Sequence, residues 1–141
     1  MDSILIVPHP EPPRRPLPCL ASRVAAGFPS PAADYLEQPL DLNELLVAHP
    51  ASTFFLRVQG DSMCQGGILD GALVVIDTSL PVTSGAIVVA EVDGEFTLKR
   101  YRCDQGRPSL HPANPDFPVI HLDPADTLRI LGVVTAAVNR F

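Results

Sequence analysis

The sequence predicts a mostly β protein, built as a compact antiparallel sheet or partly open barrel, with one short helix and an extended, flexible N-terminal arm. Apolar runs rich in β-branched and aromatic residues, separated by turn signals, fill the chain from Thr53 onward. Before them, a single short segment has helical spacing. Prolines crowd the beginning of the chain. We therefore expect an arm over residues 1–26 and a β-rich domain over residues 27–141.

The arm is expected to be extended because of its proline content. Six of the sixteen prolines lie at positions 8, 10, 12, 13, 16 and 18. Proline at this density favours polyproline-like backbone over pairing into a sheet. Residues 25–31 continue the arm with alanine, glycine, serine and proline, which predicts a mobile peptide with small side chains.

One short helix is predicted to begin after Asp41. The Asp41 side chain can cap it, and Glu44 follows three residues later. Three leucines between positions 42 and 46 share one face of this helix. The helix must end before Pro50, since the residue that precedes a proline disfavours helical backbone.

Five strands are predicted in the remainder of the chain. They cover residues 54–58, 72–76, 86–92, 95–102 and 128–138. The pair Asp93-Gly94 separates the third strand from the fourth and is a strong signal for a two-residue hairpin turn.

The composition is that of one folded domain with a sizeable core. The chain has 141 residues, of which 46% are hydrophobic, and its net charge is -6. This acidic balance disfavours attraction to phosphate backbones, so we expect no direct sequence-specific DNA binding. The apolar runs are too short to span a bilayer and the N-terminus has no signal-peptide core, so we expect a cytoplasmic protein without membrane contact.

The cysteines give no sign of a metal site. Cys19, Cys64 and Cys103 are odd in number, widely spaced and without a C-x-x-C pair. Zinc and a disulfide framework are therefore both unfavoured, and we expect neither a metal nor a cofactor.

The stretch GDSMCQGGILDG, residues 60–71, joins two predicted strands and is longer than a tight hairpin requires. Ser62 stands at its beginning. A catalytic serine needs a neighbouring base and donors for the oxyanion, and this loop offers free backbone N–H groups. By itself, a serine in a glycine-rich turn is most often a turn residue.

Lys99 is the candidate base. It is the only lysine in a chain with nine arginines. Strand periodicity places it with Thr97 and Tyr101, on the face opposite Phe96 and Leu98. A strand lysine is ordinarily a solvated charge, but a buried amine, unlike a guanidinium, can lose its proton near neutral pH.

These motifs together resemble a known family. Gly60-Asp61-Ser62-Met63, then Asp70-Gly71, then the segment 93–99, whose Lys99 lies 37 residues beyond the serine, are similar to the LexA-like family of self-cleaving Ser-Lys proteases. Residues 27–35 and 40–43 resemble the UmuD branch, the SOS mutagenesis proteins. The resemblance runs from about residue 26 to residue 138, and residues 1–22 depart from it.

The resemblance implies specific roles. Ser62 would be the nucleophile and Lys99 the general base, with the backbone N–H groups of Ser62 and Met63 holding the oxyanion. The Ala26–Gly27 bond would be the cleavage site. The family also implies a homodimer, activation by a RecA filament on single-stranded DNA, and a trimmed form that serves a UmuC-type translesion DNA polymerase as its accessory subunit.

Two other functions remain open at this stage. The chain could be a non-catalytic β-rich interaction module, or a Ser-Lys peptidase of the signal-peptidase kind that acts on other proteins. Residues 1–26 are too few for a helix-turn-helix domain, which disfavours a repressor. The four histidines, at positions 9, 49, 111 and 121, have no motif that links them to Ser62, and Cys64 is expected to be a small turn residue rather than a reactive thiol.

Overall fold

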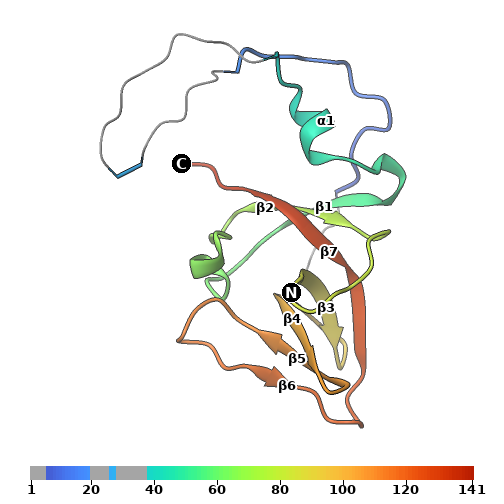
Figure 1. Ribbon diagram of the computed structural model, residues 1–141, viewed down its shortest axis with the longest axis vertical. Coiled ribbons are helices and arrows are strands. Elements are labelled where there is room, and N and C mark those ends of the chain that lie inside the picture. Colours follow the sequence, from blue (N-terminus) through green and yellow to red (C-terminus); the bar gives the residue numbers. More distant parts are fainter. Residues whose placement is uncertain (1–5, 20–25, 28–37) are drawn as a thin grey trace.

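The strands of the computed structural model form one antiparallel sheet (Figure 1). The model describes residues 6–19, 26–27 and 38–141. Within these ranges the sheet has seven strands in the order β1-β2-β7-β3-β4-β5-β6. Their bounds are β1 (Thr53–Arg57), β2 (Leu73–Asp77), β3 (Ile87–Val92), β4 (Glu95–Asp104), β5 (Arg107–His111), β6 (Ile120–His121) and β7 (Leu128–Val138). The predicted fold class is confirmed.

All five predicted strands are present, and two further strands, β5 and β6, were not predicted. β5 has the sequence RPSLH and contains a proline, which ordinarily argues against a strand. β6 is two residues long, too short for any alternation to show. Both are recognisable only through their pairing with β4 and with each other.

The predicted helix is present as α1 (Leu42–Leu46), followed by the 3₁₀ turn η1 (Pro50–Ser52). The Asp41 side chain caps α1 as expected, accepting a hydrogen bond from the Glu44 N–H at 3.1 Å. Leu42 and Leu45 are exposed. A helix of this length contributes little to the core. No helix in the described ranges is long and apolar enough to cross a membrane.

The hydrophobic core lies on both faces of the sheet. Val88 and Val89, neighbours in β3, belong to two separate buried clusters because successive strand residues point to opposite faces. The larger cluster lies over β1 and β2 and includes Met63 from the loop after β1.

β7 joins the two halves of the sheet (Figure 1). Its second part pairs with β2 and its first part with β3, and the register shifts along both pairings. Gly132 lies at this point, where a Cβ would come within 2.6 Å of the Ile76 Cγ2. Glycine at this position therefore allows β7 to approach the end of β2 closely.

The described part of the arm, residues 6–19, is extended and contacts the domain. Single antiparallel bridges join Ile6 to Phe55 and Leu17 to Leu40. The rest of the predicted arm, apart from residues 26–27, lies outside the described residues, as does the stretch 28–37. The boundary between residues 26 and 27 stays a prediction.

Candidate active site

The loop that carries Ser62 is closed at its base by the strands that flank it. Beyond β1, the Val58 N–H donates to the Ala72 carbonyl and the Gly71 N–H donates to the Val58 carbonyl, each at 2.8 Å. The Asp70 carboxylate accepts the Gly60 N–H at 2.8 Å. Gly60 has a φ of +99°, a backbone conformation that residues other than glycine rarely adopt. The loop therefore has a defined conformation held by its own hydrogen bonds, which explains why it is longer than a tight hairpin.

Two apolar side chains anchor the loop from within. Met63 is 1% exposed and Ile68 is 3% exposed, and both belong to the larger core cluster. Because Met63 is fixed in the core, the preceding residue is held at the rim of the loop. Ser62 is half-buried there.

The segment after β5 braces the same loop from outside. The Ala113 N–H donates to the Ser62 carbonyl at 2.7 Å, and the Gln65 N–H donates to the Ala113 carbonyl at 2.9 Å. The Asn114 side chain donates to the Asp61 carbonyl at 3.0 Å. These contacts join residues about fifty positions apart, and no local signal in the sequence indicates them.

Lys99 lies in β4 with its amine against Ser62. Its Nζ is 3.0 Å from the Ser62 Oγ, 2.7 Å from the Thr97 Oγ1 and 3.2 Å from the Leu98 carbonyl oxygen. A neutral amine has two N–H donors and one lone pair. It can donate to Thr97 and to the Leu98 carbonyl while it accepts the Ser62 hydroxyl proton.

The environment of Lys99 favours this neutral form. The residue is 8% exposed, and burial lowers the pKa of its amine below the ordinary value of 10.5. In the described part of the chain no carboxylate forms an ion pair with Lys99. The amine therefore has no charge partner to hold its proton.

A pocket of about 230 Å³ opens beside the two side chains. Its walls come from the end of β1 and the following loop, from β3 and β4, and from the segment after β5. They consist of Leu56, Arg57, Val58, Gln59, Gly60, Asp61, Ser62, Val89, Phe96, Thr97, Leu98, Lys99 and Phe117. A mostly apolar pocket of this size fits a small side chain next to the serine.

Two backbone donors near the serine are available. Among the hydrogen bonds of the described residues, neither the Ser62 N–H nor the Met63 N–H donates to a protein acceptor. Their use as an oxyanion hole stays a prediction.

The structure does not bring the expected cleavage site to this pocket. Ala26 and Gly27 are both exposed and are absent from the pocket walls. Figure 1 shows the short described segment 26–27 well apart from the sheet. The bond would have to move to reach Ser62.

His49, His111 and Cys64 have other contacts. His49 Nδ1 lies 2.5 Å from the Asp77 carboxylate, and His111 Nε2 lies 2.8 Å from the Ser109 hydroxyl. The Cys64 Sγ lies 3.6 Å from the Asn114 side-chain nitrogen. Within residues 6–19, 26–27 and 38–141, no cluster of three or more His, Cys, Asp or Glu side chains could hold a metal ion.

Comparisons with known proteins identify the family of this chain. A family model described as Peptidase S24-like matches residues 18–135. Protein SamA from Salmonella typhimurium is 44% identical over 137 residues, which cover 97% of this chain and 95% of SamA. Protein MucA from Escherichia coli is 49% identical over 120 residues, which cover 84% of this chain and 82% of MucA. The LexA repressor from Acidithiobacillus ferrooxidans is 44% identical over 118 residues, which cover 82% of this chain and 57% of the repressor. The chain therefore belongs to the Peptidase S24-like family, the LexA-like peptidases, and within it to the UmuD-like proteins.

Proposed function

We propose that this chain is a self-cleaving serine endopeptidase of the SOS response, which cuts its own Ala26–Gly27 bond with Ser62 as nucleophile and Lys99 as general base. The observation that carries the proposal is the 3.0 Å contact between the Lys99 Nζ and the Ser62 Oγ. It involves a lysine whose pKa is lowered by burial, which is the property a lysine needs to act as a base.

The proposed reaction proceeds in two stages. Neutral Lys99 takes the hydroxyl proton of Ser62, and the Ser62 oxygen attacks the carbonyl carbon of Ala26 to form a tetrahedral intermediate. The intermediate collapses as the bond to the Gly27 nitrogen breaks, and the Lys99 ammonium protonates that nitrogen. Neutral Lys99 then takes a proton from water, and the resulting hydroxide attacks the acyl carbon of the acyl-enzyme. The Lys99 ammonium returns the proton to the Ser62 oxygen as the ester bond breaks, which releases the new C-terminus at Ala26 and restores Ser62.

The residues around the scissile bond suit this chemistry. Alanine before the bond and glycine after it leave the carbonyl unhindered, and a methyl side chain fits the pocket of about 230 Å³ beside Ser62. The free N–H groups of Ser62 and Met63 would stabilise the negative charge on the Ala26 oxygen in the transition state.

Delivery of the bond to the pocket is the regulated step in this proposal. Segment 26–27 must enter the pocket from the same chain or from the second copy in a homodimer. The observed rate is then the chemical rate multiplied by the fraction of time that the pocket is occupied. A RecA filament on single-stranded DNA would accelerate cleavage by raising that fraction.

The trimmed chain, residues 27–141, is proposed to act as the accessory subunit of a UmuC-type translesion DNA polymerase. The similarity to the UmuD-like proteins over most of the chain supports this role. The formal net charge of -6 is consistent with binding to a protein partner rather than directly to DNA.

Intact mass spectrometry of the purified protein tests the proposal. Incubation at alkaline pH should deprotonate Lys99 and yield two products, residues 1–26 and 27–141, whereas Ser62→Ala stays intact. No cut at this bond, with or without an activated RecA filament, would contradict self-cleavage. Cleavage of an added protein but not of the chain itself would instead support a peptidase that acts on other proteins. If Ser62→Ala and Lys99→Ala retain all activity, the chain is a non-catalytic interaction module.

A further inference from the structure

The beginning of the arm pairs with the outer edge of β1 (Figure 1). The Ile6 N–H donates to the Phe55 carbonyl at 2.8 Å, and the Phe55 N–H donates to the Ile6 carbonyl at 2.7 Å. β1 is an edge strand of the sheet, so these two bonds cover backbone groups that would otherwise be open to another extended chain.

The arm makes a second set of contacts at the start of α1. Leu17 and Leu40 exchange backbone hydrogen bonds of 2.9 and 2.8 Å. The Arg15 N–H donates to one oxygen of the buried Asp41 carboxylate at 2.6 Å, while the other oxygen caps α1 through the Glu44 N–H. The hydrogen bond from Arg15 is the largest of the causes that lower the pKa of Asp41. The arm thus contacts the same carboxylate that begins the helix.

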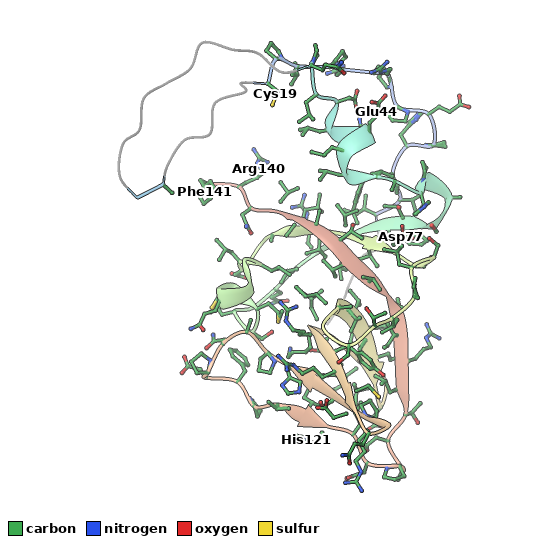
Figure 2. All side chains as sticks on the ribbon, in the orientation of Figure 1. Cys19, Glu44, Asp77, His121, Arg140 and Phe141 are labelled. Atoms are coloured by element: carbon green, nitrogen blue, oxygen red, sulfur yellow. The ribbon has the colours of Figure 1, made fainter. Side chains whose placement is uncertain are left out.

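Side chains complete the contact between these two points. Arg14 Nε lies 2.9 Å from the Glu44 carboxylate, in a pair that is exposed to solvent on both sides. A pocket of about 240 Å³ lies between the arm, at Pro8 and Pro12, and the domain, at Val47 and Pro50. Figure 2 shows Glu44 at the same end of the molecule as Cys19 of the arm, with His121 at the opposite end.

The prolines of the arm fix its register on the domain. In the described part of the arm, the backbone N–H groups of residues 6, 15 and 17 donate to the domain, and none of these residues is a proline. Prolines occupy positions 16 and 18, on either side of Leu17. A shift of one residue would put a proline, which has no N–H, where the Leu17 donor is needed. The contact is therefore specific for one alignment of this peptide.

We propose that Phe55, Leu40, Asp41 and Glu44 form a peptide-binding strip, the arm strip, and that the arm remains bound to it as a separate peptide after the chain is cut between Ala26 and Gly27. The inference rests on the proposed cleavage, because that cut leaves residues 6–17 in one product and the whole arm strip in the other. While the arm is tethered, its effective concentration at the arm strip is about millimolar, the range typical of short linkers, so it competes strongly with any added peptide. Once cut, it dissociates on dilution. Cleavage alone would therefore leave the backbone groups at the β1 edge covered. They would become accessible only when the peptide is released.

The test makes the cut without using Ser62 or Lys99. A recognition sequence for an added protease is inserted between Ala26 and Gly27 of the full chain carrying Ser62→Ala. Native mass spectrometry of the nicked chain at micromolar concentration should show both fragments in one complex. A dye-labelled synthetic peptide of residues 1–26 should exchange into the nicked chain, with a rise in fluorescence anisotropy. It should bind the uncut chain at least tenfold more weakly, since the tethered arm occupies the arm strip.

Matched peptides test the contact itself. Arg15→Ala and Arg15→Pro both remove the guanidinium, but only the proline also removes the N–H that donates to Asp41. We expect the proline peptide to bind about tenfold more weakly than the alanine peptide, as for loss of a hydrogen bond to a charged group. The peptide with Leu17→Pro should likewise bind more weakly than the peptide with Leu17→Ala.

Separation of the fragments at micromolar concentration, equal binding to nicked and uncut chain, or equal affinity of the proline and alanine peptides would overturn the inference. Failure of the natural chain to cut itself would contradict the proposed function and leave these measurements unaffected.

Discussion

Asp77 and Lys99 are two buried ionisable groups in one sheet, and their surroundings act on them in opposite ways. Asp77 is 3% exposed and Lys99 is 8% exposed. For Asp77, burial by itself raises the pKa, but hydrogen bonds from Ser79, His49 and Ser52 outweigh it and lower the pKa well below 3.8. For Lys99, burial is what lowers the pKa. The charged form is favoured at Asp77 and disfavoured at Lys99.

Their hydrogen bonds explain the difference. The Asp77 carboxylate accepts the Ser79 N–H and hydroxyl at 2.9 and 2.6 Å, the Ser52 hydroxyl at 3.0 Å and His49 Nδ1 at 2.5 Å. Asp77, labelled in Figure 2, ties η1 to the end of β2 through its contact with Ser52. Lys99 has three uncharged oxygens around it. The surroundings of Asp77 favour its charged carboxylate, which stabilises the fold. The surroundings of Lys99 favour its neutral amine.

Replacing Lys99 gives the largest expected effect. Lys99→Arg keeps a positive charge but has no lone pair to accept the Ser62 proton. We expect the self-cleavage rate, followed by intact mass spectrometry, to fall by about 10³-fold or more, in the range of lost general-base catalysis. Cleavage at an unchanged rate would show that Lys99 is not the base.

The pH dependence of the cleavage rate gives the next largest expected effect, and it reports on Lys99 rather than on Asp77. In the proposed mechanism only neutral Lys99 is active, so the cleavage rate should rise about tenfold per pH unit below its pKa and level off above it. Because this pKa is below its ordinary value of 10.5, the plateau should begin below pH 10.5. A rate that falls between pH 7 and pH 10, or that still rises tenfold per pH unit above pH 10.5, would contradict the assignment.

Asp77→Asn is expected to affect stability instead of chemistry. Asparagine can keep one oxygen for the Ser52 and Ser79 donors, but its NH2 group would face His49 Nδ1 and all of these contacts would lose the charge of the carboxylate. The free energy of unfolding at pH 7 should therefore fall by about 2 kcal/mol in urea denaturation. The cleavage rate of the folded variant should stay within about twofold. Asp116→Asn, at an exposed position, is the matched control and should change stability by less than about 0.5 kcal/mol.

The sign of the pH effect at Asp77 follows from its lowered pKa. The stabilisation is fully present above 3.8, the unfolded value, and is lost as the pH falls through the lower folded value. The stability difference between the natural chain and Asp77→Asn should therefore shrink in acid. A difference that grows as the pH falls below 4 would contradict this role.

Thr97→Val gives the smallest expected effect. It removes the hydroxyl that lies 2.7 Å from the Lys99 Nζ and orients the amine. We expect about tenfold slower cleavage, from loss of one hydrogen bond, with the plateau of the pH profile displaced. Thr97→Ser retains the hydroxyl and should restore both the rate and the profile; a serine variant as slow as the valine variant would contradict the positioning role.

Local patterns predicted most of the fold. The helix after Asp41 and five of the seven strands were predicted from capping, alternation and the Asp93-Gly94 turn. β5 and β6 were missed because a proline and a length of two residues hide their pattern. β5 is defined by its pairing with β4, and β6 by its pairing with β5.

The candidate site was predictable only in part. The placement of Ser62 and Lys99 as a pair came from the family resemblance, and strand periodicity put Thr97 on the same face as Lys99. The brace from Ala113 and Asn114 depends on tertiary contacts about fifty residues apart in the chain. The proline pattern predicted an extended arm, but it did not indicate that residues 6–17 contact β1 and α1, since backbone hydrogen bonds to an edge strand have no local signature.

The pKa of Lys99, measured by NMR, tests the central claim most directly. Lys99 is the only lysine, so incorporation of labelled lysine gives a single side-chain signal to titrate. The Ser62→Ala chain prevents cleavage during the titration, and the same protein in concentrated urea provides the unfolded reference. We predict that the folded protein titrates below 10.5 and the unfolded protein near 10.5. A folded pKa at or above 10.5 would contradict a lysine held in its neutral form to act as the base.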